Sequence, residues 1–162
     1  LFYNHLNTGR PDPDSHSFNR YSSNYLDMSN EPLYPFGYGL SYTNFSYGNL
    51  QLSSDVLSKN GELTVSVTVT NDGDFDGYEI VQMYLHDIYA EISRPVKELK
   101  GFEKVSLEAG ESRQVTLKLP RRALQYYDVI SKSWKDEPGI FTIQVGASSR
   151  DIRLQKDFEL KK

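Results

Sequence analysis

The 162-residue sequence contains no cysteine, and this absence excludes several classes of protein at once. A disulfide scaffold, a thiolate zinc site, an iron–sulfur cluster and a cysteine nucleophile all require this residue. Histidine occurs three times, and His5, His16 and His86 have no spacing that would place two of them on one face. We therefore expect no metal site, no proton relay and no cofactor.

An excess of positive charge and long apolar runs are also missing. The formal net charge is −4 and the isoelectric point is near 5.4. A nucleic-acid partner is therefore not expected, because binding it requires a basic surface that displaces counterions. No apolar run approaches the ~20 residues of a membrane span, so no membrane partner is expected either. Leu1 is preceded by neither an initiator methionine nor a signal peptide, and we interpret the sequence as a piece of a longer protein.

Helical periodicity is absent, whereas an alternation of apolar and polar residues recurs along the chain. Residues 63–69 alternate leucine or valine with threonine or serine and predict a half-buried strand, which a turn at 71–74 ends. Short strands separated by turns predict an all-β immunoglobulin or fibronectin type III-like sandwich, with a bulge at Gly101. We expect these further strands around residues 80–85, 99–107, 115–119, 125–129, 134, 141–147 and 154–160, with one helical turn at 120–124.

The same alternation predicts the core and the opposite faces of the strands. On the strand around residues 80–85, Ile80, Gln82 and Tyr84 should point away from the core. The tyrosines on strands are expected to have a buried ring and a hydrated hydroxyl; they are Tyr78, Tyr84, Tyr126 and Tyr127. The alternative is a carbohydrate-binding module, because sugars dock on flat aromatic faces. The expected core consists of Val65, Val67, Val81, Met83, Leu117, Phe141, Ile143 and Val145.

The beginning of the chain has a different composition. Residues 1–31 are rich in Asn, Ser, Asp, Pro and Arg without periodicity, and they bury too little to fold alone. We divide the chain into an irregular arm (1–46) and a sandwich (47–162). Residues 34–46 should anchor the arm, with Phe36, Leu40 and Phe45 packed on the sandwich and two glycines permitting tight turns. The expected anchor residues are Tyr34, Pro35, Phe36, Gly37, Tyr38, Gly39, Leu40, Tyr42 and Phe45.

One segment resembles a calcium loop. Asp72, Asp74 and Asp76 place oxygens at alternate positions, but Met83 stands where the closing glutamate would fall and the flanks are strands. We therefore interpret these residues as a hairpin turn.

No catalytic residue is expected in this chain. Glycoside hydrolysis needs two carboxylates that flank one bond, and general-acid work needs one of them to be buried. Asp12 and Asp14 lie in the arm, and Asp136 and Glu137 lie in a turn. No Gly-x-Ser-x-Gly elbow occurs, and the glycosylation sequon that begins at Asn44 is too short to be specific.

The block Tyr-Pro-Phe-Gly-Tyr-Gly-Leu-Ser-Tyr-Thr at residues 34–43 resembles a signature of glycoside hydrolase family 3. In those enzymes it precedes a C-terminal fibronectin type III-like domain. Residues 3–11 resemble the exit of the preceding domain in the periplasmic β-glucosidase branch, so the resemblance covers essentially the whole chain. Further matching segments are Asn71-x-Gly73, Gly77 with residues 81–84, residues 94–102, and Pro138-Gly139-x-Phe141 with Val145-Gly146.

This resemblance implies a parent enzyme that hydrolyses β-linked glucosides with retention. Its aspartate nucleophile would lie in an N-terminal barrel and its acid/base in a middle α/β domain, from whose end the arm would come. Neither motif is present, so this chain alone is expected to be inactive. The resemblance implies an accessory, buttressing domain with the upstream catalytic domains as partners and a periplasmic or secreted location. It also permits homodimer contacts or arm exchange, and contact with β-glucosides or glucans under the carbohydrate-binding alternative.

Overall fold

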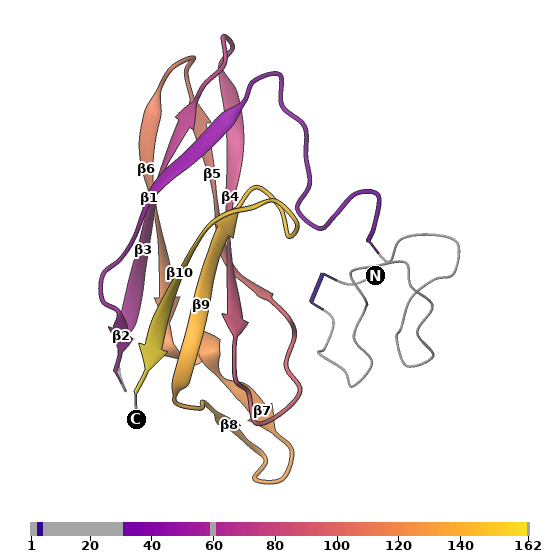
Figure 1. Cartoon of the computed structure of the whole chain (residues 1–162), viewed down its shortest axis with the longest axis vertical. Helices are drawn as coiled ribbons and strands as arrows, with labels where there is room; N and C mark the ends of the chain where they lie inside the picture. Colours follow the sequence, from indigo (N-terminus) through magenta and orange to yellow (C-terminus); the bar gives the residue numbers. More distant parts are fainter. Residues whose placement is uncertain (1–2, 5–30, 59–60, 162) are drawn as a thin grey trace.

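Strands in which apolar and polar residues alternate build a two-layered β-sandwich, as the sequence predicts (Figure 1). The structure is a computed structural model that describes residues 3–4, 31–58 and 61–161. The helical turn η1 (Arg121–Leu124) lies where it was expected. The strands are β1 (Phe45–Leu52), β2 (Val56–Leu57), β3 (Glu62–Asn71), β4 (Gly77–Asp87), β5 (Glu98–Leu107), β6 (Ser112–Pro120), β7 (Tyr126–Asp128), β8 (Ser133–Lys135), β9 (Gly139–Gly146) and β10 (Ile152–Leu160).

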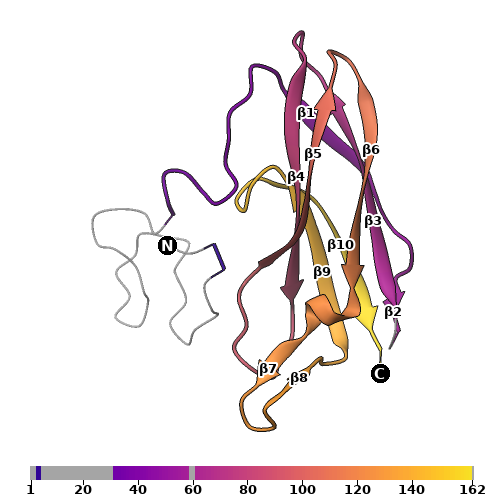
Figure 2. The same cartoon turned by 180° about the vertical axis from the view of Figure 1, so that it is seen from behind.

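The strands form two sheets that face each other, and β7 and β8 form a hairpin at one end (Figures 1 and 2). One sheet has the order β1-β3-β6 and the other the order β2-β10-β9-β4-β5. All pairs are antiparallel except β2 with β10. The register between β4 and β5 shifts beside Gly101, which lies opposite Met83, whereas Tyr84 lies opposite Leu99. The predicted bulge is therefore confirmed.

The core lies between the sheets and contains all of the predicted residues. Each of them is buried, and Leu63, Val69, Leu85, Leu107 and Leu119 extend the same layer. The rings of Phe141 and Phe158 stack with their centroids 5.8 Å apart. The period of two therefore identified the inward face of β3, β4, β6 and β9 correctly.

Strand β1 was not expected from the sequence, because its alternation changes phase partway. Its register against β3 shifts between Gly48 and Gln51, and Asn49 has a φ of 54° in the left-handed region. Phe45 and Tyr47 before this irregularity and Leu50 and Leu52 after it all pack against the core. A bulge that adds one residue thus hides a strand from a search for strict alternation.

The expectation for the tyrosines is wrong at Tyr84. Its side chain is 0% exposed and its hydroxyl donates to Oε1 of Gln82 (2.6 Å), so the hydroxyl is not hydrated. Val81 to Leu85 are all buried, whichever way their side chains point. The outward face of β4 is covered at this point by the arm. The expected burial of the ring is wrong at Tyr78 and Tyr127, which are both exposed because they lie on the outer side of their strands.

The packing expected for the arm is right for Phe45 but wrong for Leu40. Phe45 is buried where β1 begins, whereas Leu40 is 88% exposed because residues 39–42 leave the sandwich surface without pairing with a strand. Phe36 is 47% exposed, because one side of its ring stacks on Tyr3. Four residues named above, His5, Asp12, Asp14 and His16, lie outside the described residues.

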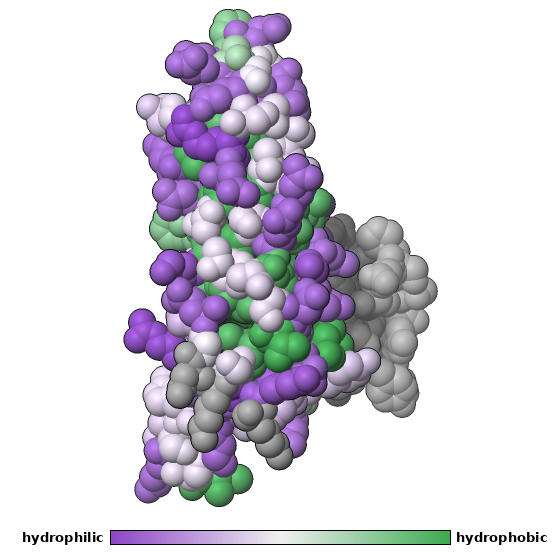
Figure 3. Space-filling view, turned by 90° about the vertical axis from the view of Figure 1, so that its left-hand side faces the viewer, coloured by the Kyte–Doolittle hydropathy of each residue, from purple (hydrophilic) through white to green (hydrophobic). Residues whose placement is uncertain are grey.

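The outer side of the three-stranded sheet is polar. Figure 3 looks onto this side, where hydrophilic residues are spread over the surface and hydrophobic ones show between them mainly in the lower half. Thr70 and Ser112 share a hydrogen bond across β3 and β6 (2.7 Å), and Lys118 pairs with Glu62 (3.1 Å). A polar, internally paired surface is suited to contact with water. The outer side of this sheet therefore differs from that of the five-stranded sheet, where the arm covers β4.

Candidate functional site

The aromatic block of the arm meets the sandwich at a tight turn over β4. The backbone N–H of Tyr38 donates to the carbonyl oxygen of Pro35 (3.0 Å), and Gly37 has a φ of 78°. A turn with this φ at its third residue favours glycine, because a β-carbon there is strained. The turn at Gly37 was predicted; Gly39 has no positive φ and open space around it, so the structure gives it no such role.

Gln82 holds this turn against the sheet. Its Nε2 donates to the carbonyl oxygens of Gly37 (3.0 Å) and Ala147 (2.6 Å), and its Oε1 accepts the hydroxyl proton of Tyr84. A fourth hydrogen bond runs from the backbone N–H of Ser149 to the carbonyl oxygen of Phe36 (2.9 Å). The buried amide of Gln82 therefore joins the arm, β4 and the end of β9 in one network, and its polar groups are satisfied.

Three aromatic rings close this contact from the outside. The ring of Tyr3 stacks on Phe36 with centroids 4.3 Å apart and meets Tyr84 edge-on at 5.8 Å. The hydroxyl of Tyr3 accepts a long hydrogen bond from the backbone N–H of Leu99 (3.4 Å). Burial raises the pKa of Tyr84, and the neighbouring Tyr3 raises it further. Tyr84 therefore keeps its proton and remains the donor to Gln82.

A second fastening lies where the arm enters β1. The hydroxyl of Thr43 donates to Oδ1 of Asn71, and Nδ2 of Asn71 donates to the carbonyl oxygens of Phe75 (2.8 Å) and Leu107 (3.2 Å). A β-carbon on Gly73 would lie 2.2 Å from Oγ1 of Thr43, and one on Gly77 would lie 2.6 Å from its Cγ2. The glycines of this hairpin thus make room for the arm.

The hairpin that resembles a calcium loop is held together by hydrogen bonds within the chain. Asn71 organises it from within, and Oδ1 of Asp76 accepts a hydrogen bond from the backbone N–H of Ala109 (3.0 Å). The described part of the chain contains no group of three or more potential metal-ligating side chains. It also contains no helix with the length and apolarity that crossing a bilayer requires.

Charged side chains add contacts on the other side of the turn. Nζ of Lys97 donates to the carbonyl oxygen of Ser149 (2.8 Å), and burial lowers the pKa of Lys97. Arg150 donates to the carbonyl oxygen of Pro32 (3.1 Å) and lies 3.5 Å from the carboxylate of Glu31. Between Glu31 and Thr43 the arm is therefore held by contacts with β3, β4 and the loop between β9 and β10.

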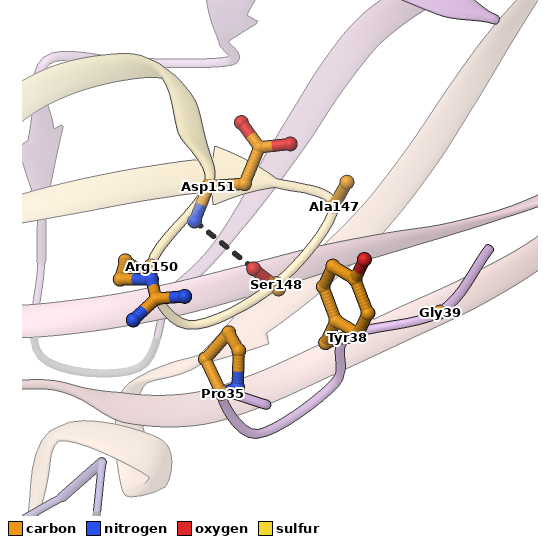
Figure 4. Close-up of a pocket in the computed structure, with 7 residues that line it drawn as sticks. All are labelled: Pro35, Tyr38, Gly39, Ala147, Ser148, Arg150 and Asp151. Atoms are coloured by element: carbon orange, nitrogen blue, oxygen red, sulfur yellow. Dashed lines mark hydrogen bonds between the residues drawn. The ribbon is translucent and has the colours of Figure 1, made fainter. Parts of the chain in front are cut away.

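A shallow pocket of about 310 Å³ lies along the seam between the arm and that loop (Figure 4). Two of its polar side chains are already paired: Oγ of Ser148 accepts from the N–H of Asp151 (3.0 Å), and the Asp151 carboxylate, which points away from Pro35 and Tyr38, pairs with Arg153 (2.9 Å). Polar groups that are used within the chain are not free to orient a ligand. The lining residues are Pro35, Tyr38, Gly39, Ala147, Ser148, Arg150 and Asp151.

The carboxylates that were considered as an acid/base pair have other partners. Asp136 forms a two-pronged ion pair with Arg121 (2.8 Å for each contact), and Glu137 accepts a hydrogen bond from the backbone N–H of Glu91 (2.9 Å). Neither lines the pocket. Asp136 and Glu137 therefore do not face this pocket as an acid/base pair.

The fixed arm leaves a group of large apolar side chains exposed, which we call the arm surface: Leu33, Tyr34, Tyr38, Leu40 and Tyr42. The outward face of β4 and β5 continues it with Tyr78, Ile80 and Phe102, all exposed. Phe102 lies opposite Gln82, the residue that binds the arm. The sequence analysis placed Ile80 on the outward face of its strand and Tyr78 among the strand tyrosines, but it did not connect them with Phe102 as one exposed group. Exposed apolar groups on a fixed backbone mark an interaction surface.

Comparison with known proteins connects the chain to a family. Residues 79–149 match the fibronectin type III-like domain. The chain is 46% identical over 161 residues to a periplasmic β-glucosidase of Salmonella typhimurium, covering 99% of this chain and 20% of that protein. It is 44% identical over 142 residues to a putative β-xylosidase of Formosa agariphila, covering 88% of this chain and 18% of that protein.

The solved structures give the same result. The β-glucosidase from Listeria innocua in complex with isofagomine superimposes with a TM-score of 0.89 and 45% identity, over 99% of this chain and 22% of that one. The chain therefore spans about a fifth of the length of the relatives that it matches.

Proposed function

Because the chain belongs to the fibronectin type III-like domains of family 3 glycoside hydrolases, we propose that it is the accessory domain of a β-glucosidase-type enzyme. Its task is to buttress the catalytic part of the polypeptide, to which the arm (1–46) joins the sandwich (47–162). The parent enzyme hydrolyses O-glycosyl bonds in carbohydrate metabolism, in the periplasm or after secretion. In this proposal the catalytic residues lie in the rest of that enzyme, and the described residues of this chain contribute none.

The observation that carries the proposal is the two-sided character of the arm. Its backbone is fixed by Gln82 and Asn71, while the side chains of Tyr34, Leu40 and Tyr42 point away from the sandwich and are exposed. Large apolar side chains that are exposed on a fixed segment indicate that another surface covers them. The relatives are about five times longer than this chain, so a neighbouring part of the same polypeptide is the natural cover.

Substrate selection belongs to the catalytic part in this proposal. Similar segments occur in proteins that are named β-glucosidase and β-xylosidase, which act on different sugars. A glucan-binding role has less support, since Ser148, Arg150 and Asp151 in the pocket along the arm already have partners within the chain.

The test uses the full-length enzyme and the isolated chain side by side. Leu40→Ser combined with Tyr42→Ser should lower the melting temperature of the full-length enzyme and speed its thermal inactivation. It should leave the melting temperature of the isolated chain unchanged, because both side chains are exposed there. Phe75→Ser, at an exposed apolar residue in the loop between β3 and β4, is the matched control and should change neither protein. Equal behaviour of the double variant and the wild type in the full-length enzyme would refute the proposal.

A further inference from the structure

We propose that the β7–β8 hairpin is a second docking element, whose apolar tip inserts into a concave apolar surface of the polypeptide that precedes the arm. The inference rests on the proposed function and adds a contact that is separate from the arm surface. The hairpin and its turn comprise residues 126–135, and they project from the end of the sandwich (Figures 1 and 2).

The hairpin exposes an unusual share of large apolar side chains. Ile130 at the tip is 90% exposed and Trp134 is 65% exposed, and Tyr127 and Val129 are also exposed. Tyr127 and Trp134 are cross-strand partners whose rings meet edge-to-face, with centroids 5.7 Å apart and planes at 73°. A contiguous exposed group of this composition is typical of the centre of a protein interface.

The base of the hairpin is held rigidly. Arg121, just before the hairpin, forms a two-pronged ion pair with Asp136, just after it, and both side chains are largely buried. Arg94, which is 7% exposed, donates to the carbonyl oxygen of Leu124 (3.0 Å) and to Asp87 (2.9 Å). Paired guanidinium contacts of this kind fix direction as well as position. The hairpin therefore keeps one orientation relative to the sandwich.

The tip is ordered as well. Asp128 accepts hydrogen bonds from the backbone N–H of Ile130 (3.1 Å) and the hydroxyl of Ser131 (2.6 Å), and it pairs with Lys135. Lys132 has a φ of 52°, the left-handed conformation that closes the turn. A segment that is ordered before it binds loses little conformational entropy on binding. The exposed apolar side chains of this ordered hairpin can therefore bind a partner at a low entropic cost.

The chemistry of the tip favours a protein surface over a saccharide. Val129 and Ile130 have no side-chain hydrogen-bonding groups, whereas a sugar presents a hydroxyl on nearly every carbon. The rings of Tyr127 and Trp134 are nearly perpendicular, so they do not form a flat platform for a sugar ring. The complementary surface is therefore apolar and concave.

The position of the hairpin favours the preceding polypeptide over a second copy. In Figures 1 and 2 the hairpin lies at the lower end of the sandwich, on the same side as residues 31–44. One body on that side can contact both the arm surface and the hairpin. About four fifths of the length of the relatives lies outside the matching segment, which is enough polypeptide for such a body.

Photo-cross-linking in the full-length enzyme tests this inference. A benzophenone amino acid is placed singly at Ile130, at Leu40 in the arm surface, and at Phe75 as the control at the opposite end. We expect cross-links within one polypeptide, to residues preceding the arm, from positions 130 and 40 and none from 75. A cross-link from 40 but not from 130 would overturn this inference and keep the proposed function. The absence of cross-links from both 130 and 40 would overturn this inference and the proposed function together. A cross-link from 130 to another copy of the enzyme would show that a second copy is the occupant and would overturn this inference.

The saccharide alternative has its own readout in the isolated chain. Trp134 is the sole tryptophan, so the intrinsic tryptophan fluorescence reports on the hairpin alone. We expect laminarin and cellobiose to leave the emission maximum and intensity unchanged. A saturable blue shift that is lost in Ile130→Ser would instead identify the hairpin as a sugar site and overturn the inference.

Discussion

Gly37 and Gln82 are in such close contact that any side chain at position 37 would have to displace the Gln82 amide. Nε2 of Gln82 donates to the carbonyl oxygen of Gly37 at 3.0 Å, and a β-carbon on Gly37 would lie 2.0 Å from Oε1 of Gln82. The glycine thus serves two purposes: it adopts a φ of 78°, and it lets a buried amide reach the arm backbone. This contact explains physically why a short aromatic and glycine-rich block is tied to a distant strand.

The first prediction follows from that contact. Gly37→Ala should release the turn from the sheet, because the left-handed conformation alone costs about 1–2 kcal/mol for a residue with a β-carbon. The backbone N–H of Ser149, which donates to Phe36, should then exchange with solvent faster. Hydrogen exchange of the isolated chain measures this. Gly39→Ala is the control and should leave the exchange unchanged, since nothing lies within 4 Å of a β-carbon there. Equal protection in both variants would contradict the proposed contact.

The second prediction concerns the buried amide. Gln82→Met keeps the length of the side chain but leaves the carbonyl oxygens of Gly37 and Ala147 and the hydroxyl of Tyr84 without their partner. Each buried polar group left unsatisfied costs about 1–3 kcal/mol, so the midpoint of urea unfolding should fall clearly. Gln114→Met, at an exposed position on β6, should have little effect. A stable Gln82→Met variant would mean that water replaces the amide and that the network is dispensable.

The third prediction is a loss of stability at alkaline pH. Burial raises the pKa of Tyr84 in the folded chain, whereas a tyrosine in the unfolded chain ionises near pH ~10. Above that pH the unfolded state binds fewer protons than the folded state, so stability falls by up to about 1.4 kcal/mol per pH unit from this group. Below pH ~10 its contribution is fully present. Unfolding free energies measured across this range should fall less steeply in Tyr84→Phe, and identical slopes would contradict the assignment.

The fourth prediction tests the core. Phe141 is buried against Phe158, so Phe141→Ala should lower the unfolding free energy by about 3–5 kcal/mol through lost burial and a cavity. The neighbouring Ile140 is partly exposed on the opposite side of β9, and Ile140→Ala should cost much less. Urea denaturation of both variants gives the comparison. Similar costs would show that β9 faces the other way.

Strand β3 shows what periodicity can predict, and β1 shows where it fails. Leu63, Val65, Val67 and Val69 alternate without interruption, and each is buried. On β1, the left-handed Asn49 shifts the phase, so the apolar residues before and after it seem to belong to different faces. A single irregular residue is enough to break the alternation, because the period of a strand is only two.

The site was predictable in its parts but not in its assembly. The sequence marks the aromatic block, the glycines of the β3–β4 hairpin and β4 itself as separate motifs. Gln82 and Tyr84 were expected on the outward face, and the Tyr84 hydroxyl was expected to be hydrated, because local alternation contains no information about what covers a face. Their cover comes from Tyr3 and Gly37, which are distant in the sequence. The sequence predicts the two strands of the hairpin at 126–135 and the turn between them, but not how its base is held, since those contacts come from Arg94 and Arg121.

The last prediction separates the early arm from the turn. Deletion of residues 1–31 removes the ring of Tyr3 from Phe36 and Tyr84, and it removes Glu31 from Arg150. Aromatic pairs are worth about 0.5–1.5 kcal/mol each, so the deletion should cost about 1–3 kcal/mol and leave the sandwich folded. Tyr3→Ala in the intact chain should reproduce most of that loss, since this residue provides both ring contacts. The turn at 35–38 should stay docked in both proteins, because its hydrogen bonds come from Gln82 and Ser149. Circular dichroism melting curves and the exchange rate of the Ser149 amide measure the two effects separately. If the deletion unfolds the sandwich, or if the Ser149 amide loses its protection in Tyr3→Ala, the early arm holds the turn and the hydrogen-bond network does not.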